Sequence, residues 1–183
     1  MVCDCIFVRK QKKSNMIKLW LIIIQLVLYC VLFTMMVKFA VRHGAVDGLF
    51  FYRKSVQEKA FELGLSTREK MNRKRKIFMT EFYVVMLVSL VLIVGLWNKL
   101  SDFWPAYFQA LLFLEVMNWY DGIVIDKLWV GHSKFWILPG CEEITYIQTW
   151  KQMLKKRLFL TAIWIIGAFI VAGIVVLIFK NNF

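Results

Sequence analysis

No polar segment of this sequence is long enough to fold as a soluble domain, since the longest one covers only residues 42–76 of 183. An internal repeat and a low-complexity linker are also absent. No lipobox precedes a cysteine and no small-residue cleavage site follows the first apolar run, so we expect that run to be retained. Acidic residues are few, 12 against 24 Lys and Arg, whereas 60% of all residues are hydrophobic. This composition excludes an ordinary water-soluble globular domain.

Four long apolar runs take the place of a soluble core. A helix needs about 20 apolar residues to cross the hydrocarbon core of a bilayer, and the mean hydropathy of the whole chain is +0.61. The runs of sufficient length cover residues 17–41, 77–98, 103–129 and 158–179. We predict an all-α polytopic membrane protein, with a single domain over 1–183, four transmembrane helices in a bundle and short amphipathic helices at the cytoplasmic face.

Basic residues concentrate in the two longer loops, 42–76 and 130–157, and this asymmetry predicts the orientation. Lys and Arg favour the cytoplasmic side of a membrane, so we expect both loops in the cytoplasm and both termini outside, in a bacterial cytoplasmic membrane. The basic run RKQKK at 9–13 opposes this orientation. Two explanations remain open: the longer loops outweigh it, or the natural chain starts at Met16.

The net charge of +12 indicates anionic membrane lipid, rather than nucleic acid, as the partner. Two basic clusters adjoin apolar runs, and no groove-reading motif stands beside them. We predict that lipid head groups bind to these clusters, which consist of Arg73, Lys74, Arg75, Lys76, Lys155, Lys156 and Arg157. No cofactor is predicted, and a homo-oligomer remains open because four spans alone would make a small transporter.

Two helix signals lie ahead of the second apolar run. The stretch VQEKAFEL at 56–63 has apolar residues at helical spacing, which predicts a short amphipathic helix on the membrane surface, ended by Gly64. Ser66 and Glu69 then form a capping box, which can start a helix that continues to Gly95.

The short link NKLSD at 98–102 favours an antiparallel helical hairpin. We expect segments 66–98 and 101–129 to form this hairpin, with Glu81 and Asp121 at similar depth.

Carboxylates within the third apolar run are the main functional signal. Ionisable residues in membrane spans usually face a bundle interior or a water-filled cavity. At 3.6 residues per turn, Glu115, Asn118 and Asp126 share one helix face. Gly122 lies on the same face and allows close approach of a helix or ligand. Asp121 points about a third of a turn away from this face. We predict a polar, acidic cavity open to the cytoplasmic leaflet, with Glu81, Glu115, Asn118, Asp121, Asp126 and His132 as candidate residues.

Structural explanations for the same residues stay open. Asp126 can form an ion pair with Lys76 or Arg75. Glu115 has no cation near it in the sequence, so it is either protonated or hydrogen-bonded to Asn118 or Gln25.

Catalytic and metal-binding roles are not assigned by any motif. His132 and the nearby acids make a divalent-metal site geometrically possible, but no H-x-x-x-H or H-E-x-x-H spacing is present. The chain also has no G-x-S-x-G, P-loop or Rossmann fingerprint.

The stretches VQEKAFELGLST (56–67), DGIVID (121–126) and FWILPG (135–140) resemble a group of small uncharacterised bacterial four-span membrane proteins. In that group a similar V-Q-E-x-A-x-E-L-G-L stretch precedes the second span, and an aromatic loop with Pro-Gly follows the third. The resemblance covers 50–143 and implies the fold and a membrane location, but no activity. Cys141 departs from it, because P-G-T-E is expected at that point.

Three classes of function remain open. The first is a membrane protein whose cavity binds a lipid head group or a small polar or cationic ligand, with transport as one such role. The second is a membrane enzyme acting on a lipid or lipid-linked substrate, and the third is an accessory or scaffold subunit of a membrane complex. We favour the first, because the reactive residues for an enzyme are incomplete and a scaffold role does not account for Glu115.

Overall fold

The computed structural model describes residues 2–143 and 148–180, apart from the side chains of 2–17. None of the described residues lies in a strand, so the all-α prediction is confirmed. The elements in chain order are α1 (Val2–Ala40), η1 (Ala45–Phe51), α2 (Lys54–Glu62), α3 (Arg68–Val91), η2 (Leu92–Trp97), α4 (Phe103–Tyr120), η3 (Asp121–Trp129), α5 (Val130–His132), η4 (Lys134–Trp136) and α6 (Trp150–Phe179).

Three helical segments in the described part of the chain are long and apolar enough to cross a membrane: Lys18–Ala40, Arg68–Trp97 and Trp150–Phe179. The fourth run expected from the sequence, 103–129, is also helical, as α4 followed directly by η3. It is not among the three.

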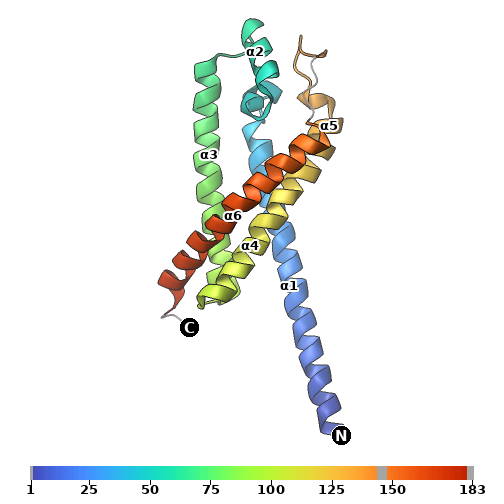
Figure 1. Cartoon of the computed structure of the whole chain (residues 1–183), viewed down its shortest axis with the longest axis vertical. Helices are drawn as coiled ribbons and strands as arrows, with labels where there is room; N and C mark the ends of the chain where they lie inside the picture. Colours follow the sequence, from blue (N-terminus) through green and yellow to red (C-terminus); the bar gives the residue numbers. More distant parts are fainter. Residues whose placement is uncertain (1, 144–147, 181–183) are drawn as a thin grey trace.

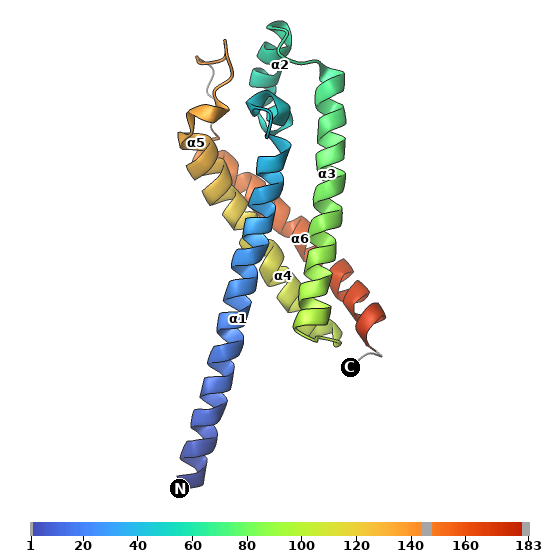
Figure 2. The same ribbon diagram turned by 180° about the vertical axis from the view of Figure 1, so that it is seen from behind.

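Helix α4 lies between α6 and α1, as the two opposite views show (Figures 1 and 2). Its main partner is α6, and four fully buried alanines on these two helices permit close packing: Ala106, Ala110, Ala168 and Ala172. The chain does reverse at 98–102, but α3 diverges from α4 instead of packing along it. The expected hairpin is therefore splayed, and α6 is the helix that covers α4.

Helix α1 is tied to its neighbours by three buried or half-buried polar contacts. The Gln25 side chain exchanges hydrogen bonds of 2.8 and 3.0 Å with Asn98 in the link after η2. The Tyr29 hydroxyl donates to the carbonyl of Met86 on α3, at 3.3 Å, and Thr34 lies 2.8 Å from the Tyr120 hydroxyl on α4. Gln25 is thus engaged with Asn98 and not with Glu115.

Both longer loops lie at one end of the molecule, where Figure 1 labels α2 and α5, and both termini lie toward the other end. At the loop end a second hydrophobic cluster includes Val56 and Ala60 of α2, together with Trp136 and Leu138. The apolar face of α2 therefore packs against protein, and the location of α2 at the membrane surface stays a prediction. Gly64, with φ 70°, ends α2 as predicted.

The predicted capping box before α3 is not formed, and the N-cap lies one residue further along the chain. Thr67, not Ser66, is the N-cap, and its hydroxyl accepts a hydrogen bond from the Lys70 amide at 3.2 Å. Because the residue three positions after Thr67 is a lysine, the reciprocal half of a capping box is missing.

The η2 segment, which continues α3, is in very close contact with the end of α6. A Cβ atom built on Gly95 in η2 would lie 2.3 Å from two ring carbons of Phe179, near the end of α6. Only a glycine fits here without movement of the ring, so this contact fixes the two helices together at the end opposite the long loops.

Replacement of Gly95 by alanine is expected to lower the thermal stability of the protein in detergent micelles, because overpacking costs about 1–3 kcal/mol. Gly173→Ala is the matched control, since a Cβ atom on that α6 residue meets nothing within 4 Å. Equal melting temperatures for the two variants would show that the contact between Gly95 and Phe179 is not tight in solution.

Candidate functional site

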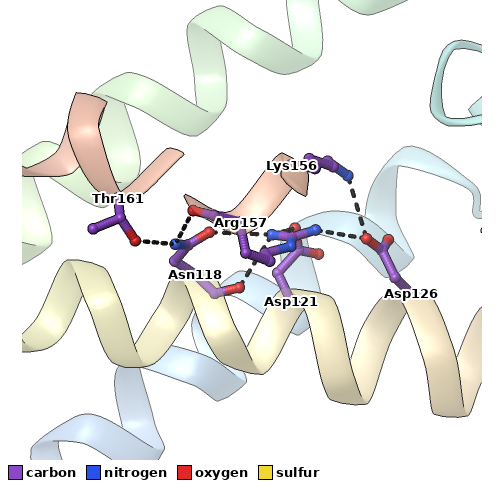
Figure 3. A network of polar contacts seen from close by, with 6 residues as sticks. All are labelled: Asn118, Asp121, Asp126, Lys156, Arg157 and Thr161. Atoms are coloured by element: carbon purple, nitrogen blue, oxygen red, sulfur yellow. Dashed lines mark hydrogen bonds and ion pairs between the residues drawn. The ribbon is translucent and has the colours of Figure 1, made fainter. Parts of the chain in front are cut away.

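Arg157 of α6 is the centre of a polar network between α6 and the α4–η3 helix (Figure 3). Its side chain is only 1% exposed. Nη1 donates to Oδ2 of Asp121 at 2.6 Å, and Nη2 donates to Oδ2 of Asp126 at 2.5 Å. Burial of a guanidinium between helices costs free energy unless the charge is paired. Here two carboxylates provide that pairing.

The π-helical geometry of η3 explains how both carboxylates reach one guanidinium. In a regular α-helix, residues five apart point about 140° away from each other. In η3 the backbone bonds run over five residues instead, as from the Val130 amide to the Ile125 carbonyl. Asp121 and Asp126, five residues apart, are thereby brought to the same side. The expectation that Asp121 points away from this side is wrong for that reason.

Gly122 provides the space in which the guanidinium lies. A Cβ atom at this position would come within 2.8 Å of Arg157 Nε and 3.0 Å of Met153 Sδ. The predicted close approach at Gly122 therefore occurs, and the approaching element is α6.

Asn118 extends the network toward the middle of α4. Its side chain is buried, and Nδ2 donates to the Arg157 carbonyl at 3.1 Å and to Thr161 Oγ1 at 3.4 Å. In return, the Asn118 carbonyl accepts from Arg157 Nη1 at 3.1 Å. The Thr161 hydroxyl donates to Glu115 Oε2 at 2.8 Å. Glu115, Asn118, Asp121 and Asp126 thus lie in one seam along α6.

Glu115 and Asp126 have partners that the sequence did not suggest. Thr161 binds Glu115, whose Oε1 atom is buried without a hydrogen-bond partner in the described residues. Lys156 lies 3.2 Å from Asp126 Oδ2 and joins Arg157 there. The expected ion pair of Asp126 with Lys76 or Arg75 is thus replaced by pairs with two α6 residues.

Glu81 and His132 lie away from this seam. Glu81 is exposed on α3, and His132 is exposed at the end of α5, with Nδ1 3.0 Å from the Lys127 carbonyl. The expected convergence of Glu81 with Asp121 and Asp126 is not seen in this network, and neither Glu81 nor His132 is among the residues that line the pocket described below. In the described part of the chain, no three His, Cys, Asp or Glu side chains gather in a way that could hold a metal ion.

The predicted basic clusters differ in their burial. The exposed members are Arg73, Arg75, Lys76, Lys155 and Lys156. Lys74 is half-buried and forms an ion pair with Asp47 of η1. Arg157 is buried, so its placement among the head-group residues is wrong: it is the one residue of the run KKR that faces α4.

A pocket of about 450 Å³ lies beside the network, between α3 and α6. Its polar lining comes from Asn118, Asp121, Asp126, Gln148, Lys156 and Arg157. The remaining walls are mainly aromatic and include Phe33, Phe50, Phe51, Phe78, Phe82, Tyr83, Trp136 and Trp164. We call this space the polar pocket.

A second pocket, of about 330 Å³, is lined almost entirely by apolar side chains of α3, α4 and α6. We call it the apolar pocket. It adjoins the polar pocket, since the two share Phe82, Tyr83, Met117, Ile163 and Trp164. We call the two neighbouring pockets together the groove, with the ion pairs at one end and apolar side chains at the other.

Comparisons with protein-family models, curated proteins and solved structures found no match for this chain. Its function is therefore inferred from the geometry of the network and the groove.

Loss of the buried cation is expected to destabilise the protein strongly. Arg157→Met leaves Asp121 and Asp126 without their main partner, and removal of one member of a buried ion pair costs about 3–5 kcal/mol. Lys155→Met, at an exposed neighbour, should stay within about 0.5 kcal/mol of the parent. Chemical denaturation in mixed micelles measures both. An Arg157→Met variant as stable as Lys155→Met would contradict the central role of the network.

Proposed function

We propose that this chain is an integral membrane protein that binds an amphiphile, a membrane lipid, in the groove between α3, α4 and α6. The observation that carries this proposal is that the polar and apolar pockets lie next to each other and share five lining residues. A head group would contact the ion pairs of the polar pocket, and an acyl chain would lie among the side chains of the apolar pocket. Such a site suits a protein that carries or senses lipid.

The direction in which the groove runs along α6 supports this proposal. Lys156 and Gln148 line the polar pocket on the side of the long loops, whereas the apolar pocket is lined by residues such as Gly167 and Ile170, further along α6. A lipid bound this way would keep its head group near the membrane surface and its chain in the hydrocarbon region. Within a bilayer an acyl chain is already out of water, so its contribution to binding comes from van der Waals packing against the apolar walls.

In this proposal α4 and η3 form a fourth span, of residues 103–129. Its polar residues do not contradict a membrane location, because Asn118 is buried and Glu115 and Asp121 are half-buried against α6. The basic loops 42–76 and 130–157 would lie in the cytoplasm. The exposed cations Arg73, Arg75, Lys76 and Lys155 would then contact anionic lipid head groups.

The enzyme alternative is less well supported. An acid–base or nucleophilic mechanism needs a reactive group at the groove, yet Glu81 and His132 are not among its lining residues. Asp121 and Asp126 do line it, but both are engaged by the guanidinium of Arg157.

Filling the apolar pocket should abolish lipid binding without unfolding the protein. A Cβ atom on Gly167, which lines this pocket, makes only ordinary contacts of 3.5 Å or more. We expect Gly167→Leu to reduce the lipid retained through purification at least about tenfold, a loss of about 1.4 kcal/mol in binding. Native mass spectrometry in mild detergent measures the retained lipid.

Gly173→Leu is the matched control for this experiment, since it adds the same side chain to the same helix outside the groove, with nothing within 4 Å of its Cβ atom. It should retain lipid as the parent protein does. Equal retention by both variants would disprove the proposed site.

Reporter fusions test the proposed orientation. Fusions at residue 1 and at residue 183 should both report an exterior location, because the basic loops are expected to stay inside. A cytoplasmic location of both ends would show that the orientation is reversed. A cytoplasmic location of only one end would contradict an even number of spans.

A further inference from the structure

The charged side chains that line the polar pocket are balanced in sign. Among the described residues, Asp121 and Asp126 face Lys156 and Arg157 there, so two negative groups meet two positive ones. A ligand with a net charge would leave an uncompensated charge in a region of low dielectric constant, which is unfavourable. A ligand that carries one charge of each sign would not.

The two cations are held very differently. Arg157 is 1% exposed and is fixed by both carboxylates and by the Asn118 carbonyl. The Lys156 side chain is 44% exposed and makes a single ion pair, with Asp126. Ion pairs of that exposure contribute little to stability. The ion pair of Lys156 with Asp126 can therefore open and exchange partners, while the ion pairs of Arg157 keep α6 against η3.

Acceptors for a second cation are present on the carboxylates. Within the described residues, Asp121 and Asp126 accept hydrogen bonds and ion pairs through Oδ2 only, and both side chains are about one-fifth exposed, at 23% and 18%. Each Oδ1 atom thus remains an acceptor for a ligand ammonium.

The aromatic walls of the same pocket suit an ammonium group as well. Ring centroids lie 5.4 Å apart for Phe50 and Phe78, 6.1 Å for Phe78 and Phe82, and 6.4 Å for Phe51 and Trp136. Clustered aromatic rings attract organic cations through the negative potential of their faces.

Donors for a group rich in acceptor oxygens are also present. The indole nitrogens of Trp136 and Trp164 are buried and have no hydrogen-bond partner in the described residues, and both tryptophans line the polar pocket. Trp136 as a whole is 1% exposed. A buried indole N–H usually has an acceptor, and phosphate or ester oxygens would supply one.

We infer that the ligand of the groove is a zwitterionic glycerophospholipid with an ammonium head group, of the ethanolamine or choline type. This inference rests on the proposed function and specifies its ligand. The lipid phosphate meets Lys156, which leaves Asp126. The ammonium meets the carboxylates and the aromatic wall, and the ester oxygens accept from the indole N–H groups. The pocket charges stay balanced throughout the exchange.

Competition between lipids with identical acyl chains tests this inference. The full-length, delipidated protein is titrated in mild detergent with short-chain phosphatidylethanolamine, phosphatidylcholine, phosphatidylglycerol and diacylglycerol, and bound lipid is counted by native mass spectrometry. Binding in the groove is defined as the part lost in Gly167→Leu. We expect both zwitterionic lipids to bind there at least about tenfold more tightly than the other two. A preference between them separates hydrogen bonding to the carboxylates from packing on the aromatic wall.

Variants at neighbouring lysines supply the control. Lys156→Met should remove the preference for zwitterionic lipid and favour a single-chain alkylammonium, because the pocket then has a net negative charge. Lys155→Met, which changes an exposed lysine outside the lining, should behave as the parent. Phosphatidylglycerol held by the exposed cations should be lost when Arg73, Arg75 and Lys76 become Gln, with no change in the groove.

The possible outcomes separate the two proposals. Equal groove binding of all four lipids, or a preference for phosphatidylglycerol there, overturns the zwitterionic ligand and leaves lipid binding intact. A zwitterion preference that survives Lys156→Met also overturns it. If no lipid binding is sensitive to Gly167→Leu, the proposed function fails, and this inference fails with it.

Discussion

The need to pair one buried guanidinium organises this structure. Arg157 cannot lie between two apolar helices without anionic partners. This requirement constrains both the η3 segment and α6. On η3 it requires two carboxylates on one side of the helix, which the π-helical geometry provides, and a glycine at position 122 to admit the side chain. On α6 it sets the rotation of the helix, so that Lys155 faces outward and Lys156 lines the polar pocket.

The groove follows from the way in which the helices are held. The close contact of Gly95 with Phe179 joins α3 to α6 at one end, while Arg157 holds α6 against η3 toward the other. Helix α3 takes no part in the Arg157 network, and the two pockets lie between its residues 78–90 and α6. The polar contacts that stabilise the α4–α6 interface thereby also form the polar end of the groove.

The sequence predicts the helical fold, the positions of the loops and the residues that share one face of the α4–η3 helix. It does not predict which helices pack against each other. Periodicity placed Glu115, Asn118 and Asp126 on one side of their helix, and the structure brings them into one seam. The short link favoured α3 as the partner of α4, although small buried residues on α4 and α6 decide the packing. Arg157 was hidden within a basic run, and a π-helical turn leaves no pattern in residue spacing.

The fit of Gly122 around Arg157 also has an evolutionary consequence. Loss of Arg157 leaves two carboxylates without their cation, and loss of either carboxylate weakens the pairing of Arg157. Any side chain at position 122 would occupy the space of the guanidinium. Each single change is therefore penalised in the background of the other three. In related sequences, the pattern D-G-x-x-x-D should be inherited together with the arginine as one block, and departures should appear as simultaneous replacements.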